Sequence, residues 1–180
     1  MSYAPKDQEL KEQEFHYRWV DGRAVFENEV LSEHRKLKTG LIAYVAHGRP
    51  ANVLTAPVMY FGVVPFFLLD LFLALYQAVC FPVYRIARVR RKDYFVFDRG
   101  RLQYLNPLER LHCVYCSYVN GLCAYATEVV ARTEQHWCPI KHAAPLRAPH
   151  SRYTYFFDYG DAARYRRELG EVRKKLSEID

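Results

Sequence analysis

The longest apolar stretch of the chain, residues 51-84, contains neither lysine nor arginine. Its only charged residue is Asp70, and its most apolar part, from Tyr60 to Pro82, is 23 residues long. A helix of that length rises ~35 Å, which is enough to cross a hydrocarbon core of ~30 Å. Core helices of soluble proteins are seldom this long and this apolar on every side. The pattern therefore predicts one membrane-inserted helical segment.

The form of this segment is open, because Pro57, Gly62, Pro65 and Pro82 interrupt it. A proline within a helix removes a hydrogen bond and kinks the axis. One interpretation is a single tilted span. The other is a re-entrant hairpin that bends between Gly62 and Pro65, although a bend exposed to lipid leaves backbone groups unpaired.

Asp70 lies near the middle of the apolar segment, where charged groups are costly and are often functional. Residues 51-84 offer no basic partner for it. We therefore expect Asp70 to be protonated or to form a local hydrogen bond.

A basic cluster follows the apolar segment directly. It consists of Arg85, Arg88, Arg90, Arg91 and Lys92. Basic residues beside a membrane bind anionic head groups at ~1 kcal/mol each. Lipid is the nearest polyanion here, so the cluster predicts a lipid-facing anchor and not a nucleic-acid patch.

Three stretches outside the apolar segment have the alternation of strands. In EFHYRWVDGRAVFE, apolar residues alternate on both sides of Asp21-Gly22, which is a strong hairpin signal. A second hairpin is expected in DYFVFDRGRLQYL, with its turn at Asp98-Arg99-Gly100. A third extended stretch is expected from Arg152 to Phe157.

Helices are expected between these stretches. Apolar residues recur every three or four positions from Asn28 to Ala46, which predicts an amphipathic helix. Asn106-Pro107 is typical of a helix start, with asparagine as the N-cap and proline at the first position. A charged helix is expected from about Asp161 to Ile179.

Together these elements predict an α+β fold, in which a small antiparallel sheet of hairpins is joined by amphipathic helices and one proline-interrupted membrane segment. The expected parts are an N-terminal hairpin and helix (1-50), the membrane segment (51-84) and a cytoplasmic region (85-180). If both hairpins share one sheet, both flanks of the membrane segment lie on one side of the bilayer. That arrangement favours the re-entrant hairpin.

The most distinctive chemistry lies in HCVYCSYVNGLCAYATEVVARTEQHWCPIKH, residues 112-142. Cys113 and Cys116 form a C-x2-C pair, and Cys138 and His142 form a C-x3-H pair. Three cysteines and one histidine suit tetrahedral zinc, and thiolates also hold iron-sulfur clusters. Because one straight helix would hold the two pairs apart, such a site needs the chain to fold back, at Asn120-Gly121.

Two other interpretations of residues 112-142 remain open. Cys113, Cys116 and Cys123 share one helix face, and cysteine is a common small core residue, so the stretch also suits a packed aromatic helix. Arg132, Glu134 and His136 are candidates for acid-base groups or for partners of a metal-bound histidine. Nothing in the sequence fixes their geometry.

The composition narrows the class of protein. Five cysteines cannot all pair within one chain, which favours reduced thiols and a cytosolic environment. Lysine and arginine outnumber acidic residues by 26 to 20. Glycine-rich nucleotide motifs are absent from the sequence, so we expect no nucleotide as partner. Because the basic cluster is assigned to lipid, we expect no nucleic acid either.

The leading hypothesis is a membrane-anchored protein, mostly on the cytoplasmic side, whose Cys/His region binds zinc or an iron centre. Its expected partners are anionic lipids. The first alternative is a cofactor-free subunit of a membrane protein complex. The second is an enzyme that acts on a lipid or membrane-embedded substrate, although a non-enzymatic role is favoured.

Overall fold

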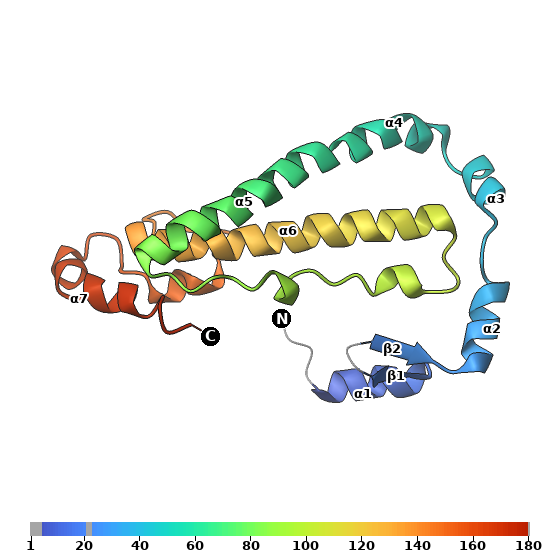
Figure 1. Cartoon of the computed structure of the whole chain (residues 1–180), viewed down its shortest axis with the longest axis horizontal. Coiled ribbons are helices and arrows are strands. Elements are labelled where there is room, and N and C mark those ends of the chain that lie inside the picture. The colour runs from blue at the N-terminus through green and yellow to red at the C-terminus, as the bar shows by residue number, and fades with distance from the viewer. Residues whose placement is uncertain (1–4, 21–22, 180) are drawn as a thin grey trace. The chain divides into compact units, whose positions relative to one another are not determined.

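The protein is described by a computed structural model that covers residues 5-20 and 23-179. It is a helix-rich chain, 65% helical, with a small two-stranded antiparallel sheet, in agreement with the predicted α+β class (Figure 1). The chain divides into two compact units, each built from two stretches of sequence. Unit 1 comprises residues 1-60 and 97-118, and unit 2 comprises residues 61-96 and 119-180.

Unit 1 begins with helix α1 (Pro5–Glu14), which the sequence reading did not predict, and the predicted first hairpin follows. Its strands β1 (Tyr17–Val20) and β2 (Arg23–Phe26) pair antiparallel, with Tyr17 opposite Phe26. The hairpin is thus confirmed. Its expected turn, Asp21-Gly22, lies outside the described residues.

The predicted helix from Asn28 to Ala46 is two helices, α2 (Asn28–Lys36) and α3 (Leu41–Ala46). The helix is interrupted between Leu37, the C-cap of α2, and Gly40, which precedes α3 in a non-helical conformation. Apolar periodicity continues across residues 37-40, so the pattern did not reveal the break.

The apolar segment forms α4 (Pro50–Phe61) and α5 (Val63–Tyr84). Gly62 separates them, where the sequence predicted a break, but its backbone is right-handed helical, with φ -55° and ψ -19°. The amide of Phe66 donates to the carbonyl of Gly62 at 3.4 Å. The backbone at this glycine is therefore helical, whereas the re-entrant hairpin requires the chain to reverse direction there.

The predicted second hairpin is wrong. Residues 85-106 contain only the short 3-10 helices η1 (Arg91–Asp93) and η2 (Arg99–Arg101). The aromatic side chains that suggested a strand pack instead on a helix: the rings of Tyr94 and Phe95 each lie 6.0 Å from that of Tyr125. These aromatic side chains thus pack against that helix and do not pair across a turn.

Helix α6 (Pro107–Trp137) begins where the sequence predicted. The side-chain oxygen of Asn106 accepts hydrogen bonds from the amides of Leu108 at 2.9 Å and Glu109 at 3.0 Å. The Glu109 carboxylate in turn accepts from the amide of Asn106, which completes a capping box.

Helix α6 then continues without a break through Asn120-Gly121, where the predicted metal site required the chain to fold back (Figure 1). Gly121 has a packing role here. A Cβ atom at this position would lie 2.7 Å from the carbonyl oxygen of Tyr94, so only glycine lets the two backbones approach this closely.

The C-terminal stretch packs within unit 2. The strand expected from Arg152 to Phe157 is mostly a 3-10 helix, η3 (Ser151–Tyr155), and extended pairing is limited to one parallel bridge between Ile140 and Phe157. The predicted charged helix is present as α7 (Ala162–Lys174), capped by Asp161. The apolar core of unit 2 includes Phe81, Leu122, Val129, Phe156, Phe157 and Leu176.

Candidate membrane-embedded face

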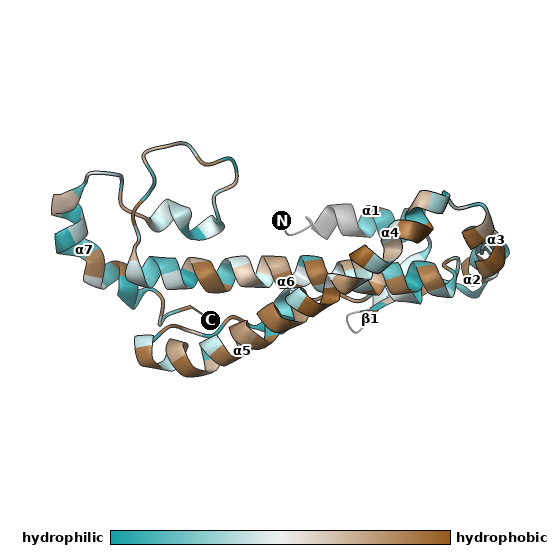
Figure 2. Ribbon diagram, turned by 90° about the horizontal axis from the view of Figure 1, so that it is seen from above, coloured by the Kyte–Doolittle hydropathy of each residue, from teal (hydrophilic) through white to brown (hydrophobic). Residues whose placement is uncertain are grey.

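The distribution of polar and apolar side chains on helix α5 is the reverse of that on a surface helix of a soluble protein. Its buried residues are Asp70, Leu73, Gln77 and Phe81, which recur every three or four positions and form what we call the inward stripe. Its exposed residues, by contrast, are all apolar, and Figure 2 shows α5 brown over most of its length. Both strongly polar side chains of the helix thus face protein, and its leucine, valine and phenylalanine side chains face outward.

The charged member of the inward stripe is paired. Asp70 accepts two hydrogen bonds from the guanidinium of Arg91, and the contact to its second oxygen measures 2.7 Å. Arg91 also lies over the ring of Phe95, 4.2 Å from its centroid. The expectation that Asp70 bonds only locally is therefore wrong, because its partner comes from beyond the apolar segment.

The amide side chain of Gln77 bridges two further groups. Its nitrogen donates to the hydroxyl of Tyr125 on α6, and its oxygen accepts from the backbone amide of Val89 at 2.8 Å. A buried amide of this kind is stabilising only when its donors and acceptors are paired. Gln77 therefore links α5 to both α6 and the chain that follows α5.

Residues 85-96, which we call the return segment, run back along α5. The amide of Ile86 donates to the carbonyl of Phe81, Val89 contacts Gln77, and Arg91 contacts Asp70. The contacts thus move toward the start of α5 as the sequence proceeds. The inward stripe is covered along its length by a polar, mostly non-helical stretch of chain.

A buried charge cluster holds the return segment, α6 and η3 together. The carboxylate of Glu128 accepts hydrogen bonds from Arg132 at 2.9 Å and Arg152 at 2.8 Å. Arg132 also donates to the carbonyl of Ala87 at 2.6 Å, and Arg152 donates to the side chain of Gln135 at 3.3 Å. One carboxylate thus organises three segments that are distant in sequence.

Burial acts to raise the pKa of Glu128, because the charged form loses solvation. The hydrogen bonds from Arg152 and Arg132 act in the opposite direction and outweigh burial, so the pKa of Glu128 lies below its ordinary value. The carboxylate is therefore ionised at neutral pH.

The predicted basic anchor is exposed but partly engaged with protein. Arg90 pairs with Asp93 at 3.0 Å, Arg91 with Asp70, and Arg88 donates to the carbonyl of Ala78 at 3.4 Å. The backbone of Arg85 is left-handed, with φ 57°, at the end of α5. Binding of head groups by this cluster stays a prediction.

The four predicted metal ligands are spread along α6 and beyond it. Because α6 is continuous, Cys116 and Cys138 are separated by ~33 Å of helical rise. The ring of His142 stacks on that of Tyr153, with 6.2 Å between centroids. Over residues 5-20 and 23-179, no three His, Cys, Asp or Glu side chains are grouped to hold a metal ion. Metal binding by Cys113, Cys116, Cys138 and His142 stays a prediction.

Arg132, Glu134 and His136 contact different parts of the chain. Arg132 belongs to the buried charge cluster, and Glu134 lies 3.0 Å from the side chain of His150. His136 stacks on Tyr84, with ring centroids 5.1 Å apart. Burial and then the nearby Arg173 lower the pKa of His136, which favours its neutral form.

Sequence reasoning missed the pairings of Asp70 and Glu128. The signal for the first was a lone carboxylate within an apolar helix, followed by a dense basic cluster. Glu128 and Arg132 are four residues apart on α6, but nothing local in the sequence indicated Arg152 as a further partner of Glu128. Comparison with protein families, with curated proteins and with solved structures finds no match for the chain.

Proposed function

We propose that the chain is a monotopic membrane protein, in which α5 lies in one leaflet with its inward stripe against protein and its apolar face against lipid. The observation that carries the proposal is that α5 turns its strongly polar side chains toward protein and exposes only apolar ones. Only 11% of the most apolar window of α4 and α5 is buried within the protein, whereas a core helix of a soluble domain is mostly buried.

The energetics favour covering this face. Removing a leucine or phenylalanine side chain from water is worth about 1.5–3 kcal/mol. Phe67, Leu68, Leu71, Phe72 and Leu75 are each 59–62% exposed, so each of them gains from contact with lipid. The basic residues beside the helix suit an anionic lipid surface.

A complete crossing fits α5 less well than one-sided insertion. With 22 residues α5 is long enough to cross, at ~33 Å. The return segment, however, is bonded to it as far back as Asp70. A crossing helix would draw a non-helical stretch with several arginines into the hydrocarbon layer, where unpaired backbone groups and charges are costly. Insertion in the plane of one leaflet leaves that stretch on the protein side.

In this role the protein fixes a polar, charged body at the membrane surface, as an anchoring or assembly component. The metal site predicted from the Cys/His spacing is a separate proposal. It neither supports nor weakens the insertion of α5.

Flotation of the purified protein with protein-free anionic vesicles tests the proposal. The wild type is expected to float with the vesicles. Leu75→Glu places a charge on the apolar face and should weaken the partition on the order of tenfold or more. Leu37→Glu is the matched control, because Leu37 is 73% exposed but lies outside α4 and α5. Failure of the wild type to float, or equal effects of the two substitutions, would show that lipid does not cover this face.

A further inference from the structure

Unit 1 contains a cavity of about 670 Å³ whose lining includes no residue of α4 or α5. It lies between the end of α1, the hairpin, α2 and the chain after η2. Its walls include Phe15, Tyr17, Phe26, His34 and Tyr104. A volume of this order is typical of sites for small molecules.

The aromatic walls form a connected series. The rings of Tyr17 and Phe26 are 5.5 Å apart, those of Phe26 and His34 are 5.1 Å apart, and those of His34 and Tyr104 are 5.1 Å apart. The last two pairs meet at steep angles, 67° and 86°, so the ring faces point in different directions. The faces of tyrosine and phenylalanine rings attract cations, and Phe15, Tyr17, Phe26 and Tyr104 bring four such rings to this cavity.

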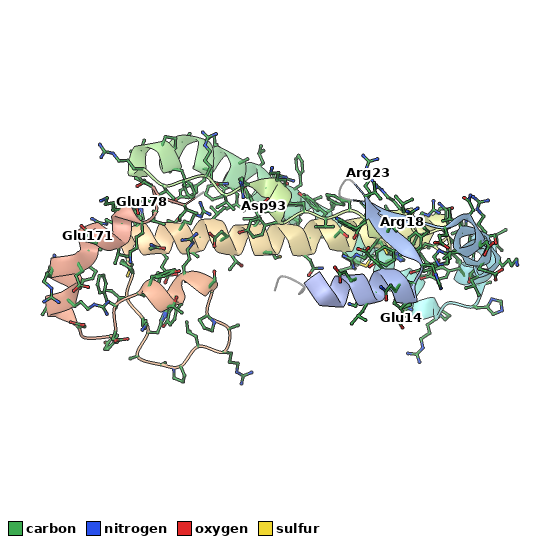
Figure 3. The ribbon with its side chains drawn as sticks, turned by 90° about the horizontal axis from the view of Figure 1, so that it is seen from below. Glu14, Arg18, Arg23, Asp93, Glu171 and Glu178 are labelled. Carbon is green, nitrogen blue, oxygen red and sulfur yellow. The ribbon has the colours of Figure 1, made fainter. Side chains whose placement is uncertain are left out.

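The carboxylates at this cavity have the complementary charge. Glu14, Glu29 and Glu33 line it, and Glu33 pairs with Lys36 at 2.6 Å. In the part of the chain that the structure describes, Glu14 and Glu29 form no ion pair. The register of the hairpin puts Tyr17 and Phe26 on one face and Arg18 and Arg23, labelled in Figure 3, on the other. The basic residues of the hairpin therefore point away from the aromatic face.

Two further features single out this cavity. His16, which also lines it, has φ 50°, a left-handed conformation that is unusual for a residue other than glycine and often marks a functional site. The Nδ1 atom of His34 is buried and has no hydrogen-bond partner among the described residues.

A second hollow adjoins the cavity and shares Tyr17, Phe26 and Leu102 with it. Its lining includes Arg99 and Arg101 together with one acidic residue, Asp98. Arginine pairs readily with phosphate oxygens. An aromatic site with carboxylates and a site with two arginines thus lie side by side on one face of the hairpin.

We propose that these two hollows bind a phosphocholine group, with the quaternary ammonium among the aromatic rings beside Glu14 and Glu29 and the phosphate beside Arg99 and Arg101. The group can come from a membrane lipid or from a free zwitterion. No residue of this site belongs to α5, so the proposal does not depend on whether that helix enters a membrane.

Calorimetric titration of the full chain in a maltoside detergent tests the site, with phosphocholine, choline and 3,3-dimethylbutan-1-ol as probes. The alcohol has the shape of choline without its charge. We expect phosphocholine to bind most tightly and the neutral alcohol most weakly. Equal binding of choline and the alcohol, or no binding of any probe, overturns the proposal.

Two variants and two matched controls connect binding to the named residues. Tyr104→Leu should weaken phosphocholine binding by roughly two- to thirtyfold, the range of a cation–π contact. Glu29→Gln should also weaken it, because it removes a negative charge beside the quaternary ammonium. Tyr159→Leu and Glu171→Gln change the same residue types at exposed positions in unit 2 and should leave binding unchanged. Equal effects in both sets contradict the assignment.

Competition identifies the source of the group. Phosphatidylcholine vesicles should displace bound phosphocholine where the physiological ligand is a lipid head group, and phosphatidylglycerol vesicles should not. Displacement by neither type of vesicle assigns the site to a free zwitterion. Equal displacement by both types contradicts recognition of the quaternary ammonium.

Discussion

Replacing Glu128 by alanine tests the buried charge cluster on which unit 2 depends. The side chains of Glu128, Arg132 and Arg152 are only 12%, 7% and 13% exposed. Removing the carboxylate leaves two guanidinium groups close together and away from water. Breaking a buried charge pair in this way typically costs about 3–5 kcal/mol, and we expect Glu128→Ala to lower the free energy of unfolding by that amount.

The assay is urea denaturation in a mild detergent at neutral pH, followed by far-UV circular dichroism. The chain offers a matched control in Glu168, which also accepts hydrogen bonds from two arginines, Arg164 and Arg167, but on the exposed face of α7. Surface ion pairs contribute little, so Glu168→Ala should scarcely move the transition. Equal loss of stability in the two alanine variants would refute the reasoning.

The pH dependence of the same measurement gives a second check. The pKa of Glu128 is lower in the folded protein than its ordinary value. Such a group stabilises the fold above its unfolded pKa, and the contribution is lost as the pH falls through the lower, folded pKa. The wild type should therefore lose stability more steeply on acidification than Glu128→Gln, which has no proton to bind at this position.

Three further predictions follow from the packing. Gly121→Ala should destabilise the protein, because the new Cβ would clash with a carbonyl oxygen, whereas Gly170→Ala, with open space around it, should stabilise α7 by roughly 1 kcal/mol in thermal unfolding. Gln77→Leu should lower the unfolding free energy by about 1–3 kcal/mol, because it leaves a buried amide and a hydroxyl unpaired. Elemental analysis after anaerobic purification tests the predicted metal site: zinc or iron that is present in the wild type and lost from Cys113→Ser with Cys138→Ser would support it, and equal metal content in the two proteins would contradict it.

Short sequence patterns correctly predicted the elements that are stabilised by residues close to one another in the sequence. The hairpin at Asp21-Gly22 and the start of α6 at Asn106 each depend on a few neighbouring residues, and the strands of the first and the cap of the second are present. Gly121 shows the limit of such reasoning. A glycine after an asparagine suggested a turn, but its small size serves the close approach of Tyr94, a contact that no local pattern encodes.

The candidate site was predictable only in part for the same reason. The apolar character of residues 51-84 was evident, and so was the anomaly of Asp70 within them. The partner of Asp70 lies 21 residues further along, in a stretch whose alternating aromatics resembled a strand. Whether Arg91 faces lipid or a carboxylate depends on how the return segment packs, which is set by tertiary contacts.

The depth of α5 in a bilayer is the most direct test of one-sided insertion. Val64, Leu71, Leu75 and Val79 lie along the face opposite the inward stripe and are all exposed. Single cysteines at these positions, in a chain without the native cysteines, can each carry a fluorophore whose quenching by nitroxide lipids reports depth. Insertion in the plane of one leaflet predicts similar depths at all four positions. A depth that varies steadily along the helix, with its two ends in opposite leaflets, would contradict the account.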